Sequence, residues 1–263
     1  MSIQKTAVVQ DAYEHLLHAE QTKKSVTPLT DLYPSLTVHE AYQVQLKAID
    51  QKVKAGQKIV GKKIGLTSFA MQELLGVDQP DYGHLLDSMN VPNKGSIAVD
   101  SLFEPKVEGE VAFVLNKDLK GPNVTAEDVL AATESIIPSL EIVDSRILNW
   151  KIKLQDTVAD NASCGLYVLG GEKFAVNGLD LTKIEMNLYK NGELMNKGTG
   201  ADVLGHPATC VAWLANKLSE YNVILKAGEV ILSGALSAAV VAQKGDVFTA
   251  EFSELGKVEV SFR

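Results

Sequence analysis

Cysteine is nearly absent from this sequence of 263 residues, since only Cys164 and Cys210 occur, each in an apolar setting. Two cysteines are too few for a disulfide framework, so we expect buried free thiols in a reducing compartment. Long apolar runs are also missing: no segment approaches the ~18 residues that a membrane span needs. The N-terminal stretch carries scattered charges and no apolar core of a signal peptide. We therefore expect a cytoplasmic protein with no membrane partner.

Positive charge is in deficit, with 25 Lys and Arg against 33 Asp and Glu and a formal net charge of −8. This balance argues against nucleic acid as a main partner. No H-E-x-x-H, C-x-x-C or G-x-S-x-G motif occurs, which excludes the common zinc and serine-hydrolase signatures. The run GQKIVGKK resembles a phosphate-binding loop, but Lys63 occupies the position of its essential hydroxyl. We interpret that run as a strand and not as a nucleotide site.

The apolar spacing predicts an N-terminal helical part. One helix is expected over residues 5–23, and a second begins after Thr37, which forms a capping box with Glu40. From residue 58 onward, short β-branched runs alternate with turn residues and only occasional helices, so a doubly wound parallel sheet is excluded. The predicted class is α+β. A helical region (1–57) would pack on a β-rich catalytic domain (58–263), and together they would form one globular unit.

Three local patterns in the β-rich part are specific enough to predict. A helix is expected over residues 125–136, with Thr125 as N-cap and Asp128 at the capping-box position. A second helix should follow the pair His206-Pro207, which we interpret as a helix start and not as a ligand. The segment YKNGE predicts a hairpin with a type I′ turn, because Asn-Gly tolerates the positive φ angles of that turn.

Glu108 and Glu110 lie two residues apart in a β-rich run and therefore project from the same face of a strand. Their repulsion is costly unless a cation lies between them or water screens them. Gly109 leaves the opposite face without a side chain, as close packing would require. The alternative is a solvated strand face that also includes Glu104 and Lys106.

Glu141 strengthens the interpretation as a metal site. It lies within the apolar run IIPSLEIVD, where an unpaired carboxylate would be expensive to bury. Carboxylate oxygens without His or Cys suit a hard ion such as Mg²⁺ or Mn²⁺. Such a trio leaves about half of an octahedral shell for water and substrate, which is typical of a catalytic metal.

Lys63 and Asp81 are the other candidates. Lys62 and Lys63 should point to opposite faces of a strand, so that one is solvated and the other points inward. An inward lysine near a metal could orient a substrate carboxylate or transfer a proton. The alternative is a pair of ordinary surface lysines. Asp81 falls in the turn-rich segment GVDQPDYG, where turn chemistry alone would explain both it and Asp78.

Several segments together resemble a known family. KKIGLTS, GVDQPDYGHL, PKVEGEVAFVL, PSLEIVDSRI, DTVADNASCG, LGHP and GEVILSGAL with KGD resemble the fumarylacetoacetate hydrolase superfamily. Within it they are most similar to the 2-hydroxypenta-2,4-dienoate (2-oxopent-4-enoate) hydratases of aromatic meta-cleavage catabolism. The resemblance extends from about residue 30 to residue 263. It implies a mixed β-roll assembled into homo-oligomers.

The resemblance also implies site residues. The acidic ligands that hold Mg²⁺ or Mn²⁺ in the family fall on Glu108, Glu110 and Glu141. The family's active-site lysine and aspartate fall on Lys63 and Asp81. The DNAS segment with Ser163 lies along the substrate pocket in such enzymes, so Lys63 and Ser163 are expected to contact the substrate.

The implied activity is a hydro-lyase reaction that adds water to 2-hydroxypenta-2,4-dienoate and yields 4-hydroxy-2-oxopentanoate. The nearest alternative is the 4-oxalocrotonate (2-oxohex-3-enedioate) decarboxylase branch, which shares the metal site and the lysine. In that branch the position of Asp81 is apolar, whereas this sequence reads QPDYG; KIGLTS and LGHPAT resemble both branches. A second alternative is a non-catalytic subunit that binds 2-oxo acids and associates with a neighbouring enzyme of the pathway.

Overall fold

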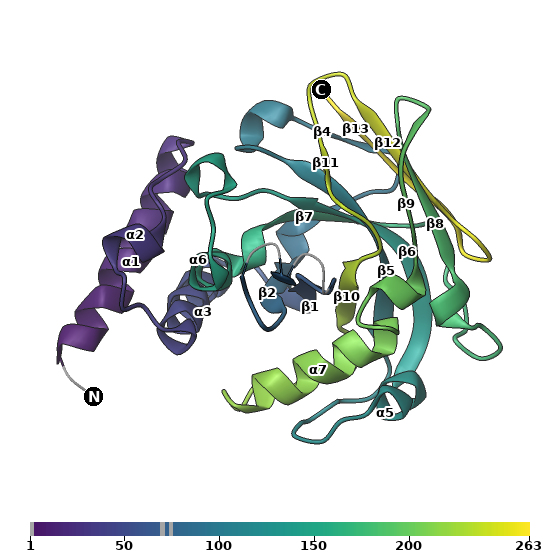
Figure 1. The fold of residues 1–263 in the computed structure, drawn as a ribbon, viewed down its shortest axis with the longest axis horizontal. Coiled ribbons are helices and arrows are strands. Elements are labelled where there is room, and N and C mark those ends of the chain that lie inside the picture. Colours follow the sequence, from purple (N-terminus) through teal and green to yellow (C-terminus); the bar gives the residue numbers. More distant parts are fainter. Residues whose placement is uncertain (1–2, 69–71, 74–75) are drawn as a thin grey trace.

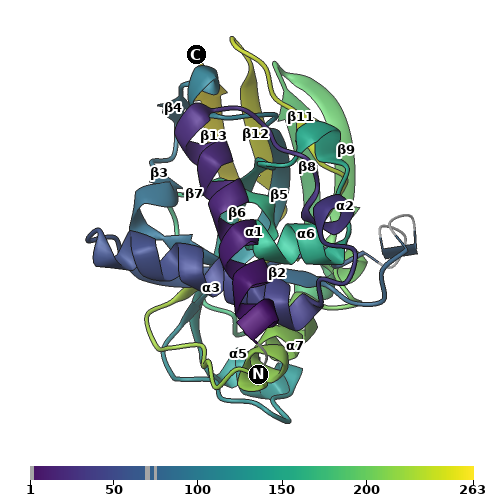
Figure 2. The ribbon, with the colours of Figure 1, turned by 90° about the vertical axis from the view of Figure 1, so that its left-hand side faces the viewer.

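The computed structural model describes residues 3–68, 72–73 and 76–263. The chain begins with the helices α1 (Ile3–Thr22), α2 (Leu29–Leu32) and α3 (Val38–Lys54). Figure 2 shows α1 lying lengthwise over the side of the molecule on which α3 and α6 lie. Both long helices were expected from apolar spacing. The proposed division of the chain into 1–57 and 58–263 stays a prediction.

The larger sheet has eight strands in the order β2-β1-β10-β5-β6-β7-β3, with β11 paired to β5. The pairs β1–β10 and β3–β7 are parallel and the remaining pairs are antiparallel. In sheet order the strands are β2 (Asp81–Leu86), β1 (Ile59–Gly65), β10 (Val230–Ala235), β5 (Lys106–Leu115), β6 (Thr133–Val143), β7 (Cys164–Leu169), β3 (Asn90–Val91) and β11 (Val240–Val241).

The smaller sheet covers one face of β5 and β6 (Figure 1). Its five strands are β4 (Gly95–Ile97), β13 (Gly256–Phe262), β12 (Val247–Phe252), β8 (Glu185–Lys190) and β9 (Glu193–Thr199). Val111 and Phe113 of β5 share one buried core with Met186 and Phe248 of this sheet. The opposite face of β5 carries Ala112 and lies over a second, smaller core. The two faces of β5 therefore have separate surroundings.

Further helices and turns connect the strands. The helices are α5 (Ala126–Ala131), α6 (Leu154–Ala159) and α7 (Pro207–Ser219), and α7 packs against β10 and β1. The short 3-10 turns are η1 (Asp87–Met89), η2 (Val99–Ser101), η3 (Leu148–Trp150), η4 (Asn161–Ser163), η5 (Leu181–Lys183) and η6 (Gly200–Asp202). No helix among the described residues is long and apolar enough to cross a membrane.

The predicted helix caps are confirmed, but one helix is shorter than expected. Thr37 accepts a hydrogen bond from the Glu40 amide and Thr125 accepts one from Asp128, each within a complete capping box. The helix predicted over 125–136 ends at Ala131, and β6 begins two residues later. Its second half is instead a β-branched stretch that pairs with β5 along the whole strand. Tertiary pairing overrides the local helical pattern there.

Two further local predictions are confirmed. The hairpin between β8 and β9 turns through Asn191 (φ 53°) and Gly192 (φ 82°), as a type I′ turn requires. His206 is the N-cap of α7, and its Nδ1 accepts a hydrogen bond from the Ala208 amide at 3.0 Å. Both cysteines are buried free thiols. The mixed α+β class holds.

Candidate metal centre and active site

Three glutamates meet on one face of the larger sheet. In the antiparallel pairing of β5 with β6, Glu108 lies directly opposite Glu141, and Glu110 follows two residues along the same face. One carboxylate oxygen of each lies within 4.8 Å of the others. Within the described part of the chain, no other group of three His, Cys, Asp or Glu side chains has such geometry. The alternative of a solvated strand face is therefore wrong for Glu110, which is fully buried, as is Glu141.

These carboxylates lack the partners that buried charges need. Glu110 Oε2 accepts a hydrogen bond from the Gly234 amide at 2.9 Å, but Glu110 Oε1 and Glu141 Oε2 accept none from the described residues. Burial, and then the charge of Glu141, raises the pKa of Glu110 well above its ordinary value. The same causes raise the pKa of Glu108 to about 7. A divalent cation among these oxygens would remove the repulsion, so the donor set fits a hard metal ion.

Gly109 is required on the other face of β5. A Cβ atom there would lie 2.9 Å from Met186 Sδ of the smaller sheet. The glycine between the two glutamates thus allows the sheets to pack closely, as the sequence predicted.

Lys63 extends from β1 toward this cluster. Its Nζ lies 3.2 Å from Glu141 Oε1 and donates a hydrogen bond to the Ala162 carbonyl at 2.9 Å. Burial alone would lower the pKa of this lysine, but the charges of Glu141 and Asp81 raise it above its ordinary value. Lys63 is therefore an ammonium donor beside the candidate metal site.

The expectation that one of the paired lysines is solvated is wrong. Lys62 does point to the opposite face, but its side chain is buried and its Nζ lies 2.7 and 2.8 Å from the two oxygens of Glu229. β1 is an inner strand between β2 and β10, and both of its faces are covered. A buried ammonium there needs a carboxylate partner, which Glu229 supplies.

Asp81 does not lie in a loop, contrary to the expectation from its turn-rich surroundings. It is the first residue of β2, is buried, and pairs with Gly65. A Cβ atom on Gly65 would lie 2.2 Å from Asp81 Oδ1 and 3.0 Å from Lys63 Nζ. Gly65 thus makes room for both groups at one point. Asp81 Oδ1 accepts no hydrogen bond from the described residues, so it is free to contact a substrate or water.

Ser163 belongs to a turn that faces Lys63. Asn161, Ala162 and Ser163 all have positive φ angles, of 55°, 50° and 50°. This turn presents the Ala162 carbonyl to Lys63, and the Ser163 hydroxyl lies 3.4 Å from Asp160 Oδ2. The turn is therefore next to the candidate site, while contact between Ser163 and a substrate stays a prediction.

Two neighbours of the site carried no usable signal in the sequence. The Cys164 thiol lies beside Glu141, and burial followed by that charge raises its pKa well above the ordinary value. Thr67 touches Gly234: a Cβ atom on Gly234 would lie 2.3 Å from Thr67 Oγ1, while the Gly234 amide binds Glu110. Because these contacts join distant parts of the chain, only the tertiary fold reveals them.

Comparison with known proteins places the chain in a family. The family model described as fumarylacetoacetate (FAA) hydrolase C-terminal matches residues 82–263. The 2-hydroxyhexa-2,4-dienoate hydratase of Comamonas testosteroni is 47% identical over 251 residues, which are 95% of each chain. The 2-keto-4-pentenoate hydratase of Paraburkholderia xenovorans is 44% identical over 253 residues, 96% of this chain and 94% of the relative.

A solved structure is similar throughout. The 4-oxalocrotonate decarboxylase from Pseudomonas putida G7, complexed with magnesium and adipate, matches with a TM-score of 0.95 and 37% identity over 100% of this chain and 99% of that one. The same enzyme has also been solved with calcium and acetate. The chain therefore belongs to the fumarylacetoacetate hydrolase family. Within the family, the relatives that carry the higher sequence identity are dienoate hydratases, as the resemblance implied.

Proposed function

We propose that the protein is a divalent-metal-dependent hydro-lyase that adds water to 2-hydroxypenta-2,4-dienoate in the meta-cleavage catabolism of aromatic compounds. The observation that carries this proposal is the carboxylate trio next to Lys63 and Asp81, in which oxygens of the buried Glu110 and Glu141 accept no hydrogen bond from the described residues. The sequence similarity to dienoate hydratases supports the same reaction. The product would be 4-hydroxy-2-oxopentanoate.

Glu108, Glu110 and Glu141 would hold the ion, and Mg²⁺ or Mn²⁺ suits their oxygen atoms. When bound, such an ion supplies Lewis-acid polarisation of a 2-oxo acid. The protein's own groups handle the protons. The dienol loses its hydroxyl proton and gains one at C5, and water then adds its oxygen at C4 and a proton at C3. Lys63 and Asp81, whose polar atoms both lie beside Gly65, form the proton-transfer pair.

We further propose that Ser163 lines the substrate pocket with Lys63. The turn that carries Ser163 contacts the Lys63 ammonium through the Ala162 carbonyl, which supports this placement. A homo-oligomer, and association with a neighbouring enzyme of the pathway, belong to the same proposal. Light scattering of the purified protein, alone and with that enzyme, measures both.

Decarboxylation of 2-oxohex-3-enedioate is the second candidate, because the decarboxylase structure superimposes over the whole chain. Both reactions can use the trio and Lys63. Only hydration needs a carboxylate that accepts a proton from the water attacking C4. Asp81 is buried beside Lys63, and its Oδ1 accepts no hydrogen bond from the part of the chain that the structure describes, which favours hydration.

The test is to supply purified protein and Mg²⁺ or Mn²⁺ with 2-hydroxypenta-2,4-dienoate, follow the dienol absorbance and identify the product. A parallel sample receives 2-oxohex-3-enedioate and is monitored for CO₂. Metal-dependent formation of 4-hydroxy-2-oxopentanoate is expected. Release of CO₂ without hydration would make the protein a decarboxylase. Binding of metal and 2-oxo acids without turnover of either substrate would indicate a non-catalytic partner subunit.

Asp81→Asn sharpens this test. We expect the hydration rate to fall about 10²–10⁴-fold, the usual contribution of a positioned acid or base. Metal affinity should stay close to that of the parent protein, because Asp81 is not in the carboxylate trio. Full activity in this variant would remove Asp81 from the mechanism.

A further inference from the structure

The turn that follows α6 is held in an unusual backbone conformation. Asn161, Ala162 and Ser163 are consecutive non-glycine residues with φ angles of 55°, 50° and 50°. L-residues adopt this left-handed region only rarely, and usually singly. A run of three persists only where the surrounding structure imposes it, and such strain clusters at functional sites. Two things must therefore be explained: which contact the strained turn makes possible, and which groups hold it in this conformation.

The reason is visible at its centre. The Ala162 carbonyl points at Lys63 and accepts a hydrogen bond from Nζ at 2.9 Å. The same Nζ lies 3.2 Å from Glu141 Oε1. A right-handed or extended turn would direct that carbonyl elsewhere, and the ammonium would lose the acceptor that fixes its position.

The support is a single buried guanidinium. Arg146 Nε lies 2.6 Å from Asp160 Oδ1, and its Nη2 donates to the Asp160 carbonyl. Its Nη1 donates to the carbonyls of Asp144 at 2.7 Å and Cys164 at 3.1 Å. Asp160 and Cys164 are the residues on either side of the left-handed run. One planar fork of donors thus clamps both ends of the turn, a task that suits arginine better than lysine.

The middle of the turn is fixed to β2. The Asn161 side chain exchanges hydrogen bonds with the His84 backbone at 2.7 and 2.9 Å. A Cβ atom on Gly83 would lie 2.4 Å from the Asn161 carbonyl, so this glycine permits the contact. These bonds locate the turn, whereas the clamp determines the direction of its carbonyls.

We propose that Arg146 is a positioning residue for Lys63, which it holds in place through the left-handed turn and the Ala162 carbonyl. The inference rests on the proposed function, because it gives Lys63 a role in turnover. It predicts that loss of the clamp lowers kcat while metal affinity changes little, because none of the described contacts of Arg146 reaches the carboxylate trio.

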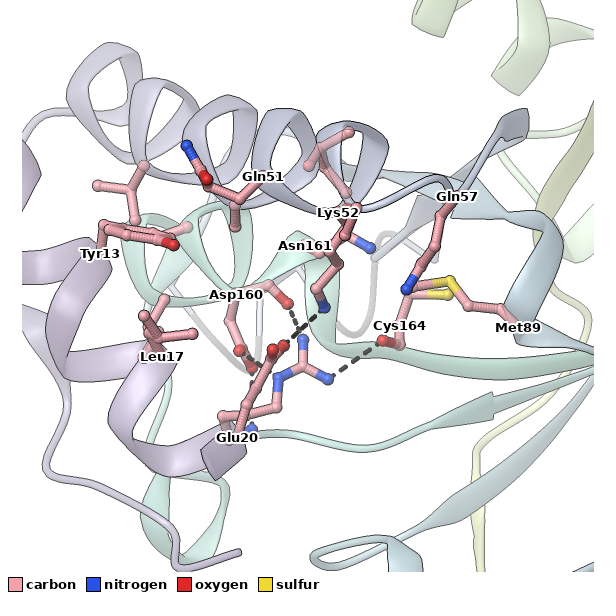
Figure 3. A pocket seen from close by; sticks show the side chains of 17 residues that line it. Tyr13, Leu17, Glu20, Gln51, Lys52, Gln57, Met89, Asp160, Asn161 and Cys164 are labelled. Carbon is pink, nitrogen blue, oxygen red and sulfur yellow. Dashed lines mark hydrogen bonds and ion pairs between the residues drawn. The ribbon is translucent and has the colours of Figure 1, made fainter. Parts of the chain in front are cut away.

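A cavity makes the clamp accessible to a small cation. The cavity has a volume of about 210 Å³ and is lined by Arg146, Asp160 and Cys164 together with residues of α1 and α3. Figure 3 shows Tyr13 and Leu17 on one side of it and Cys164 on the other. In Arg146→Ala the cavity would extend into the space of the lost side chain, so added guanidinium can enter and bind the same acceptors.

The experiment measures kcat, KM and metal affinity for Arg146→Ala, Lys63→Met and the double variant. We expect Arg146→Ala to lower kcat about 10–100-fold, as loss of an outer-shell partner typically does. Millimolar guanidinium should restore part of that loss. In the Lys63→Met background, Arg146→Ala should cost no further kcat, because the clamp acts through Lys63. Losses that multiply would show a merely structural role and overturn the inference.

Further variants keep the test decisive. Lys52→Met is the matched control: Lys52 lines the same cavity but bonds to Glu20 and not to the turn, so kcat should be unchanged. Arg146→Lys covers the case in which Arg146→Ala does not fold. It keeps the charge but not the fork, and kcat should still fall, whereas full activity would overturn the inference.

A crystal structure of Arg146→Lys separates this inference from the proposed function, because it needs no activity. The Ala162 carbonyl should have turned away from Lys63. A turn that keeps its positive φ angles and its bond to Lys63 would overturn the positioning role even if the enzyme is an active hydratase. A wild-type protein that turns over neither substrate would instead overturn the proposed function.

Discussion

Lys62 and Lys63 are neighbours on β1, both buried, and yet they lie in opposite electrostatic surroundings. Lys62 Nζ donates hydrogen bonds to both carboxylate oxygens of Glu229, at 2.7 and 2.8 Å. Glu229 also accepts a hydrogen bond from the Lys226 amide at 3.0 Å. Lys63 faces several carboxylates, and among the described residues some of their oxygens accept no hydrogen bond. We call the Lys62 side of β1 complete, because Lys62 and Glu229 satisfy each other, and the Lys63 side open, because carboxylate oxygens there accept no hydrogen bond from the described residues.

The difference separates structural charge from functional charge. A buried pair whose donors and acceptors are matched holds two segments together and has no capacity left for a ligand. On the Lys63 side, acidic groups outnumber cations, and burial together with mutual repulsion raises the pKa values of Glu108 and Glu110. Such an imbalance costs stability and persists where an ion or substrate completes it. Burial alone would not distinguish the two lysines.

The largest effect is expected from breaking the open side. Glu141→Gln should weaken Mg²⁺ or Mn²⁺ binding by more than about 100-fold, the upper range for losing even an outer-shell partner, and should abolish turnover. Calorimetric titration with the metal measures this. The matched control is Glu229→Gln on the complete side, which should keep metal affinity. Unchanged metal affinity in Glu141→Gln would contradict its assignment as a ligand.

The two lysines allow the comparison to be tested with one substitution type. Lys63→Met should lower the kcat of the folded protein about 10²–10⁴-fold. Lys62→Met leaves Glu229 buried without its cation and should cost about 3–5 kcal/mol in stability, while the folded fraction keeps its kcat. Denaturant titration and steady-state kinetics separate the outcomes.

A second change on the complete side should reverse its loss. Lys62→Met combined with Glu229→Leu removes both buried charges and should regain most of the stability. If the double variant stays as unstable as Lys62→Met, the pair is not the reason that Lys62 is buried.

How far the sequence could predict these surroundings depends on how far apart the contacting residues lie along the chain. The capping boxes, the Asn191-Gly192 turn and the shared face of Glu108 and Glu110 all follow from residues a few positions apart, and each is found in the structure. Glu141 was a candidate because an unpaired carboxylate in an apolar run is expensive to bury, but its position opposite Glu108 depends on the register of β5 against β6, which local spacing does not give. Local spacing reports which face a side chain takes but not what covers that face.

The wrong predictions have one physical cause. Both interpretations of the lysine pair left Lys62 in solvent. Local spacing could not reveal its partner, because Glu229 lies 167 residues away in the chain. Asp81 was placed in a turn because its neighbours are turn formers, whereas β2 pairs with β1 from that residue onward. Tertiary pairing decides both cases, and single-residue propensity carries no information about it.

A smaller effect is expected from pH on the Lys62 side. His84 lies across from Lys62 in the β1–β2 register, and burial, then the charge of Lys62, lowers its pKa to about 3. The unfolded chain therefore binds a proton near the ordinary pKa that the folded chain does not bind, and stability falls as pH decreases from 7. From pH 7 to pH 5 the loss should be about 2 kcal/mol.

The check is the pH dependence of the unfolding free energy, compared between the parent protein and His84→Gln. Other groups titrate in both proteins, so the difference between the two curves isolates His84. The parent should lose about 2 kcal/mol more than the variant over this range. Parallel curves would mean that His84 is protonated in the folded protein or solvated, and the Lys62 side would not be as closed as its contacts indicate.

The smallest effect is expected at Ser163, which lies in the turn that contacts Lys63. Its hydroxyl lies 3.4 Å from Asp160 Oδ2, a weak bond that leaves the group able to turn toward a substrate. If it does so, Ser163→Ala removes one hydrogen bond worth about 0.5–1.5 kcal/mol, and KM should rise about 2–12-fold with little change in kcat. Ser135→Ala is the control, since Ser135 lies near the start of β6, away from Glu141, with a buried hydroxyl that has no hydrogen-bond partner among the described residues. Equal KM values in the two variants would mean that Ser163 only supports the turn, and that the open region ends at Lys63.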